Sequence, residues 1–177
     1  MANKIQNFDT GEKDNSNIIH LDLDPKINIE NKIYFKNLLK KIAECSLDDL
    51  KNNLENLYHV DAEFNGFHPI NEIKGIEEIK NKYLIPLKKA FPDLERRNNL
   101  VIGGAFRDKV FVSFISHLTG TFTNEWLGVK PTNKTIYLRT CEAHQITNNK
   151  IIKSYTLIDT GDFIRQAGYW PINKSLG

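Results

Sequence analysis

The chain has 177 residues, 40% of them hydrophobic and 10% aromatic, which suffices for one well-filled core and is too short for two ordinary domains. Its 24 basic and 22 acidic residues leave a formal charge of +2, too small to hold a polyanion, so nucleic-acid binding is not expected. Two distant cysteines, Cys45 and Cys141, form neither a disulfide framework nor a zinc motif and fit a reducing cytoplasm.

The N-terminal part is predicted to be a polar extension, residues 1–30, ahead of a single domain over residues 31–177. Its first 17 residues are rich in Asn and show no hydrophobic period. They lack the apolar core of an export signal, and no apolar run reaches the roughly 20 residues that span a bilayer. We therefore expect a soluble, cytoplasmic protein that does not insert in membranes.

Apolar and polar residues alternate in the stretch "IIHLDLDPKINI", residues 18–29, and this pattern predicts an extended edge segment interrupted by Pro25. His20, Asp22 and Asp24 would then share one face. Solvated acids on an edge strand explain this pattern more simply than half of a metal site, because ligation needs further donors. No metal is expected.

Helices are predicted for the next third of the chain. "KIYFKNLLKKIAEC", residues 32–45, has apolar residues at helical spacing. Ser46, with Asp49 three positions later, is typical of the N-terminus of a second helix, whose leucines repeat every three to four residues. A third helix is predicted after Gly75, with a kink at Pro86. The inward-facing positions expected for the three helices are Tyr34, Leu38, Leu39, Ile42 and Cys45; Leu47, Leu50, Leu54 and Leu57; Ile76, Ile79, Tyr83 and Leu87.

From residue 95 the hydrophobic period changes from helical to two. Four successive antiparallel strands are predicted over residues 95–106, 109–122, 134–146 and 150–159. Helices first and a meander last predict an α+β domain in which the helices cover one face of the sheet.

The turn Asn148-Asn149 sets the register that we expect for the last two strands, because Asn tolerates positive φ. With Thr147 opposite Lys150, one face of the sheet combines apolar and ionisable side chains. An apolar wall with a few convergent polar groups is typical of a small-molecule pocket. The predicted members of this face are Leu138, Glu142, His144, Tyr155, Leu157 and Asp159.

Asp159 ends the last predicted strand, and two explanations of it remain open. In a poorly hydrated hollow, its carboxylate would exchange a proton with a carbon or oxygen acid. Alternatively, it caps the following turn "GDFIRQAG" or pairs with Arg165. At about 3.3 Å per residue, Asp159 and His144 lie roughly 20 Å apart on a flat ladder, so a direct hydrogen bond between them is not expected.

Two further side chains are candidates for the lining of the same pocket. His117 shares one face of its strand with Phe111 and Ile115, although a lone His on an apolar strand is more often a hydrogen-bonded core residue. Trp126 would close the mouth of a pocket or complete the core. No phosphate-binding glycine loop or catalytic serine or zinc motif is present, so no cofactor is expected.

The order of several short motifs resembles the SnoaL-like polyketide cyclases of the nuclear transport factor 2-like superfamily. These motifs are "AFPDLE", "GTF", "WLGVKPTNKT", "NNKIIKSYTLID" and "DFIRQAG", and the resemblance runs from about Leu50 to Pro171. It implies a cone-shaped, cystatin-like fold, with a curved antiparallel sheet wrapped around helices, a deep pocket for a small ligand, and often a homodimer.

The resemblance also implies roles for individual residues. An Asp at the end of the last strand, here Asp159, acts as acid/base in a cofactor-free aldol closure. A His on the preceding strand, here His144, helps to bind the substrate, with Glu142 as a polar pocket residue.

Two hypotheses follow. In the first, the protein is a cofactor-independent enzyme in which Asp159 and His144 are catalytic and Glu142, Tyr155, His117 and Trp126 bind a small, apolar carbonyl compound. In the second, the same fold is a non-catalytic module for ligand binding or dimerisation.

Overall fold

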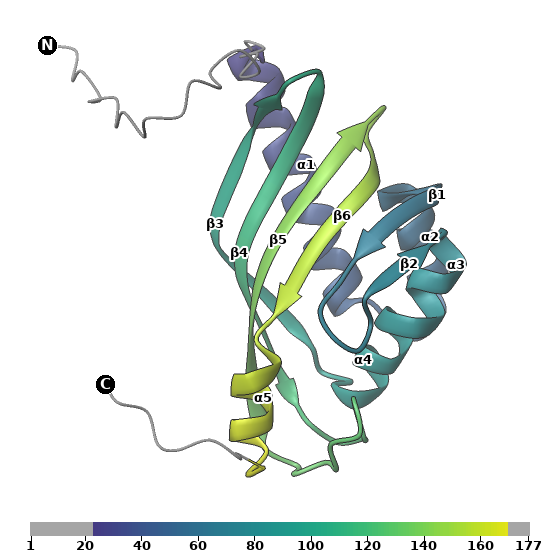
Figure 1. Ribbon diagram of the computed structural model, residues 1–177, viewed down its shortest axis with the longest axis vertical. Helices are drawn as coiled ribbons and strands as arrows, with labels where there is room; N and C mark the ends of the chain where they lie inside the picture. Colours follow the sequence, from purple (N-terminus) through teal and green to yellow (C-terminus); the bar gives the residue numbers. More distant parts are fainter. Residues whose placement is uncertain (1–22, 170–177) are drawn as a thin grey trace, which may run out of the picture.

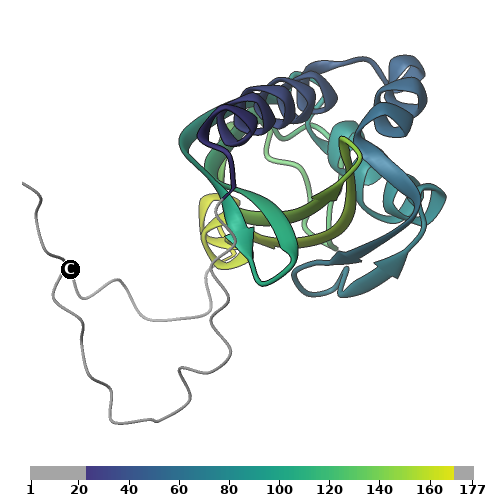
Figure 2. The same ribbon diagram turned by 90° about the horizontal axis from the view of Figure 1, so that it is seen from above.

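A strongly curved sheet with helices on its concave side makes up the described part of the protein (Figures 1 and 2). The computed structural model describes residues 23–169. The helices are α1 (Pro25–Glu44), α2 (Leu47–Leu57), α3 (Ile76–Ile79), α4 (Ile85–Ala90) and α5 (Thr160–Gln166), with a π-helical turn over Lys80–Leu84 between α3 and α4. The strands are β1 (Tyr58–Asn65), β2 (Glu72–Lys74), β3 (Glu95–Phe106), β4 (Lys109–Thr121), β5 (Thr135–Thr147) and β6 (Lys150–Ile158).

The sheet has the strand order β2-β1-β6-β5-β4-β3 and is antiparallel except between β1 and β6. All four predicted strands of the C-terminal half are present, and their meander forms the long part of the sheet. α1 packs along β3 and β4, while α2 packs against β1 and β6 (Figure 2). The predicted α+β architecture with helices on one sheet face is therefore confirmed.

The predicted edge segment over residues 18–29 is wrong where the structure describes it. α1 already begins at Pro25, so the last residues of the predicted extension are helical. The Asp24 carboxylate accepts hydrogen bonds from the amides of Lys26 (2.7 Å) and Ile27 (3.4 Å), as an N-cap does. His20 and Asp22 lie outside the described residues. Within residues 23–169, no group of three potential ligands could hold a metal ion.

The first helix buries a different stripe from the predicted one. Phe35, Leu39, Ile42 and Ala43 are buried, whereas Tyr34 is exposed. Leu39 and Ile42 belong to both sets, so the stripe is rotated by about one residue toward Phe35. Helical spacing predicts that a stripe exists, but the strand on which the helix rests decides which side of it faces inward.

The other helices begin as predicted. The Ser46 hydroxyl accepts from the amide of Asp49 at 3.1 Å and starts α2. Ile79, Tyr83 and Leu87 point inward from the third helical segment. The π-helical turn lies just before Pro86, which cannot supply a backbone N–H to a regular α-helical ladder.

One bulge in β6 sets the positions of the functional side chains. Asn148 and Asn149 both have positive φ, and Thr147 pairs with Lys150 as predicted. The next pairs are Ile146 with Ile151 and Gln145 with Lys153, so Ile152 is an extra residue on β6. Such a bulge moves every later side chain of the strand to the opposite face.

None of the helices within the described part of the chain is long and apolar enough to cross a bilayer.

Candidate functional site

The inner face of the four long strands carries a group of buried polar side chains in an otherwise apolar core. β5 contributes Glu142 and His144, as predicted from alternation, together with Thr140, which is not among the predicted residues. Their neighbours on β6 are Ser154 and Thr156, because His144 pairs with Ser154 and Glu142 with Thr156. β3 and β4 add Arg96 and Ser116. Burial of polar groups is unfavourable unless each one finds a partner.

The Glu142 carboxylate lies at the centre of this group. Its Oε1 accepts hydrogen bonds from Arg96 Nη1 at 2.9 Å and from Thr140 Oγ1 at 2.8 Å. Its Oε2 lies 3.2 Å from Nε2 of His144. Both oxygens of a buried carboxylate are thus hydrogen-bonded, and its charge is paired with a guanidinium.

His144 continues the network toward β1. Its Nδ1 lies 2.9 Å from the Ser154 hydroxyl, which is 3.5 Å from the hydroxyl of Tyr58. A neutral imidazole that donates from Nε2 to Glu142 accepts from Ser154 at Nδ1. His144 therefore orients the carboxylate on one side and is oriented by Ser154 on the other.

Arg96 is held as firmly as the carboxylate that it pairs with. Its Nε donates to Asn98 Oδ1 and its Nη2 to Ser116 Oγ, both at 3.0 Å. The guanidinium also lies 5.4 Å from the centre of the Phe114 ring. Such a fixed cation leaves Glu142 little freedom to turn away.

Burial and neighbouring charges shift the pKa values of three groups in or beside this network, Glu142, Tyr58 and Tyr83. Burial alone would raise the pKa of Glu142, but the charge of Arg96 and the hydrogen bond of His144 outweigh it and lower this pKa to about 2. Burial raises the pKa of Tyr58 to about 12, and it also raises the pKa of Tyr83. Near neutral pH the site therefore combines an ionised carboxylate with two phenols that remain hydrogen-bond donors.

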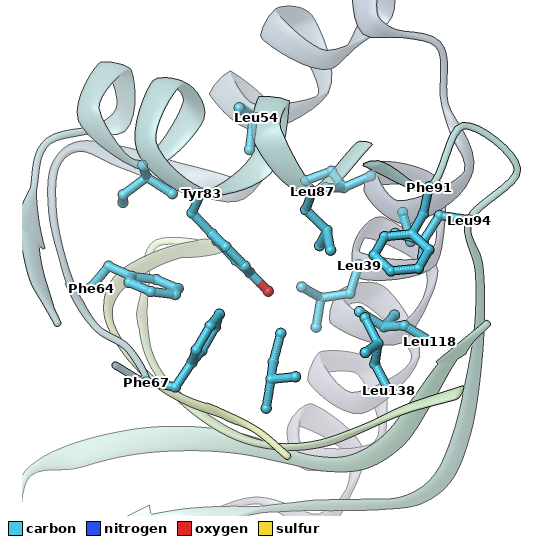
Figure 3. Close-up of a cluster of buried hydrophobic side chains, with 14 of the residues drawn as sticks. Leu39, Leu54, Phe64, Phe67, Tyr83, Leu87, Phe91, Leu94, Leu118 and Leu138 are labelled. Atoms are coloured by element: carbon cyan, nitrogen blue, oxygen red, sulfur yellow. The ribbon is translucent and has the colours of Figure 1, made fainter. Parts of the chain in front are cut away.

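A small cavity of about 40 Å³ lies against this network. Glu142, Arg96, Tyr83 and Lys88 are the ionisable side chains on its wall. Figure 3 shows the Tyr83 hydroxyl pointing to the middle of the surrounding side chains. This volume accommodates a few water molecules at roughly 15 Å³ each, whereas small-molecule sites measure roughly 300–1,000 Å³. The remaining lining residues are Leu39, Ile42, Ala43, Leu84, Leu87, Leu94, Leu118 and Thr156.

Asp159 does not lie in this interior, so the prediction that it is a pocket carboxylate is wrong. Its side chain is 38% exposed and pairs with Arg139 at 2.8 Å. Its other oxygen accepts from the amide of Asp162 at 2.8 Å and caps α5. The capping alternative is the one found, with Arg139 rather than Arg165 as the cationic partner.

Tyr155 and His117 are also on the outer face, contrary to the prediction that they line the pocket. The bulge at Ile152 turns Tyr155 and Leu157 outward, and both are exposed. His117 alternates with the buried Ser116 and Leu118, and its Nδ1 lies 2.9 Å from Asn99 Oδ1.

Trp126 completes the core, which was one of its two predicted roles. It is 2% exposed, and its ring lies 5.1 to 6.0 Å from those of Phe163, Phe91 and Phe67. It does not line the cavity at Glu142. Aromatic side chains of the core therefore surround Trp126, and its other predicted role, at the mouth of a pocket, is not found.

Several residues of this site, Arg96, Tyr83 and Ser154 among them, are not among the site residues predicted from the sequence. Arg96 resembles one half of an exposed basic pair, yet alternation from Glu95 already places it on the opposite face from its neighbour. Tyr83 is predicted as an inward helix position and no more. Ser154 becomes an inner residue only through the bulge, which no local pattern indicates.

The family model of the SnoaL-like polyketide cyclases matches residues 37–167. No curated protein matches the chain significantly. Solved structures share the fold at low identity. AclR of Streptomyces galilaeus is 19% identical with a TM-score of 0.66, over 84% of this chain and 87% of its own.

Three other solved structures extend the likeness. A SnoaL-like protein of Jannaschia sp. CCS1 is 17% identical, with a TM-score of 0.62 over 86% of this chain and 99% of its own. A protein of Catenulispora acidiphila with a ketosteroid isomerase-like fold was solved in complex with trimethylamine. It is 11% identical, with a TM-score of 0.59 over 77% of this chain and 93% of its own. A nuclear transport factor 2-like protein of Salmonella enterica has the same fold at 13% identity and a TM-score of 0.58. The predicted nuclear transport factor 2-like fold is therefore confirmed.

Proposed function

The chain belongs to the SnoaL-like polyketide cyclase family, and from this membership we propose that it is a cofactor-independent enzyme that transfers a proton on a small, mostly apolar carbonyl compound. The observation that carries the proposal is the Glu142 carboxylate, which is ionised and held by three partners on the wall of an interior cavity. Burying such a network is unfavourable for stability compared with an apolar core, and active sites are where such arrangements gather.

In the proposed reaction the cavity of about 40 Å³ first widens to admit the compound, and Glu142 then accepts a proton from the carbon next to the carbonyl group. The electrons of the broken C–H bond pass to the carbonyl oxygen, and the Tyr83 hydroxyl donates a hydrogen bond to the resulting enolate. In a cyclisation, the enolate carbon then attacks a second carbonyl group of the same molecule, whose π electrons move to its oxygen, and the new alkoxide takes the proton back from the Glu142 carboxyl group.

Arg96 and His144 adjust the basicity of Glu142. While Arg96 is paired with the carboxylate, its low pKa makes Glu142 a weak base. A carbonyl oxygen that accepts the Arg96 N–H in its place becomes polarised and weakens the ion pair, which raises the proton affinity of Glu142. His144, at 3.2 Å, keeps the carboxylate in position and can share the proton.

Hydrogen–deuterium exchange tests the proposal without knowledge of the natural substrate. Ketones and β-dicarbonyl compounds are incubated in D2O, and loss of the proton next to the carbonyl is followed by NMR. The wild type is expected to accelerate exchange of at least one compound. The exchange rate of Tyr83→Phe is expected to be about a hundredfold lower than that of the wild type, since one hydrogen-bond donor to an oxyanion contributes 10²–10³-fold to a rate. Glu142→Gln, checked for folding by circular dichroism, is expected to fall to the uncatalysed rate.

Asp159→Asn is the matched control, because it removes the carboxylate for which the sequence predicted this role. It is expected to retain the wild-type exchange rate. If Asp159→Asn abolished exchange while Tyr83→Phe and Glu142→Gln kept it, the assignment to Glu142 would be refuted. If compounds bound but no exchange occurred, the alternative of a non-catalytic ligand-binding module would hold, a role that the tight Arg96–Glu142 pairing favours.

We further propose that the protein is a cytoplasmic homodimer that pairs through the outer face of the sheet. One row of neighbouring side chains crosses four strands there, Leu100, Ile115, Cys141 and Leu157 in order. A second row includes Ile102 and Tyr155. The apolar and aromatic side chains of both rows are exposed, and so is Cys141. Exposed apolar surface of this extent is typical of an interaction site.

Light scattering coupled to size exclusion tests the dimer. The wild type is expected at twice the chain mass of 20.4 kDa, and Leu157→Lys, at a 62% exposed position, is expected to shift it to the monomer. Ile33→Lys is the control, since Ile33 is 55% exposed on α1 and away from the outer face. A monomeric wild type, or a Leu157→Lys variant that stays dimeric, would exclude this interface.

A further inference from the structure

A second reactive group, the amine of Lys88, lies at the same cavity as Glu142. Lys88 is in the last turn of α4 and is buried, unlike its neighbour Lys89. Its side chain lines the interior cavity and also a surface groove of about 880 Å³. It therefore stands between the interior and a space large enough for a small organic molecule.

The partners of this amine are neutral. Nζ donates to the backbone carbonyl oxygens of Ala43 at 2.8 Å and Ile42 at 3.4 Å, in the last turn of α1. An ammonium group has three protons to donate, and these bonds use two. Within residues 23–169, no carboxylate lies at ion-pair distance from it.

The surroundings shift the protonation equilibrium of this amine toward its neutral form. Burial lowers the pKa of Lys88 and outweighs the opposing influence of Cys45 and Glu44, which would raise it. A lysine in its neutral form is a nucleophile toward carbonyl carbons. A purely structural role is the alternative, because a cation at the C-terminus of α1 stabilises the helix.

We propose that Lys88 is a covalent binding site for aldehydes and ketones, with which it forms an imine. This inference rests on the proposed function only in that the ligand is a carbonyl compound. The carbonyl end of such a ligand would lie at Lys88, and the rest of a longer ligand would lie in the surface groove.

The imine forms by addition and loss of water. The lone pair of Nζ makes the C–N bond while the π electrons of the C=O bond move to oxygen, and a proton passes from nitrogen to that oxygen. A proton from water converts the hydroxyl group into a leaving water molecule as the nitrogen lone pair forms the C=N bond. The product is an iminium ion, which acidifies the neighbouring C–H bond that faces the Glu142 side of the cavity; loss of the N–H proton gives the neutral imine.

Reductive trapping tests the site. The full-length protein is treated briefly at pH 7 with limiting propanal or butanone and cyanoborohydride, which reduces only the iminium, and the alkylated lysines are identified by peptide mass spectrometry. Lys88 is expected to react measurably faster than Lys89, because burial lowers the pKa of Lys88 and so increases its share of neutral amine at pH 7. Lys88→Arg keeps a cation at the end of α1 and is expected to remove only this fast adduct.

Several results would separate this proposal from its alternatives. Labelling of Lys88 no faster than that of Lys89 would overturn it and leave Lys88 as a helix-capping cation. Because both lysines are compared within the wild-type protein, this result does not depend on the folding of the variant. Fast labelling of Lys88 without hydrogen–deuterium exchange would support the Lys88 site and contradict the proposed function. Exchange without fast labelling of Lys88 would support the proposed function and contradict the Lys88 site.

Discussion

Replacement of Glu142 by glutamine is expected to lower the free energy of unfolding by about 3–5 kcal/mol, because it leaves the buried Arg96 guanidinium without its counter-charge. The same loss is expected for Arg96→Met, which leaves the buried Glu142 carboxylate without its counter-charge. Urea unfolding followed by circular dichroism measures both values.

The double variant Arg96→Met/Glu142→Leu is expected to lose less than either single variant, about 2 kcal/mol or less, since no unpaired charge remains in the core. Glu63→Gln is the matched control. Glu63 pairs with Lys153 at 2.7 Å on the surface, so its unfolding midpoint is expected to stay unchanged. Additive losses in the double variant would show that the two side chains stabilise the fold independently.

Acid is expected to destabilise the wild type more than this double variant, by about 3 kcal/mol between pH 6 and pH 2. The pKa of Glu142 is about 2 in the folded protein and 4.5 for an ordinary Glu side chain. A lowered folded-state pKa stabilises the fold above pH 4.5, and this contribution disappears as the pH falls toward 2. The unfolded chain then takes up a proton that the folded chain does not.

Urea unfolding at a series of pH values measures this difference. The exposed carboxylates, among them Glu63, Glu77 and Asp93, are common to both proteins, so their titration cancels in the comparison. Parallel stability curves for the wild type and the double variant would mean that Glu142 is not held ionised by Arg96.

These measurements bear on the function as well as on the stability. A protein that retains a buried ion pair where apolar side chains would fold at least as well is using that pair for something other than stability. If the double variant is stable and dimeric but inactive in hydrogen–deuterium exchange, the pair belongs to the site and not to the scaffold.

Local sequence patterns were sufficient for most of the architecture. The change of hydrophobic period at residue 95 predicted the four long strands, and Asn148-Asn149 predicted the turn between β5 and β6. Alternation along β5 also placed Glu142 and His144 together on one face. Each of these properties depends on residues a few positions apart in the chain, where period and turn chemistry act.

The composition of the site depended on tertiary packing. Ile151 and Ile152 are both suited to the core, and packing selects Ile151, which makes Ile152 the bulged residue. From there on β6 presents Ser154 and Thr156 to the interior and Tyr155 to solvent, and Asp159 is left to cap α5. Arg96 reaches Glu142 across β4, the strand between them. A one-residue offset in a strand and an ion pair between distant segments depend on how the whole sheet closes over its helices, and no local pattern contains that information.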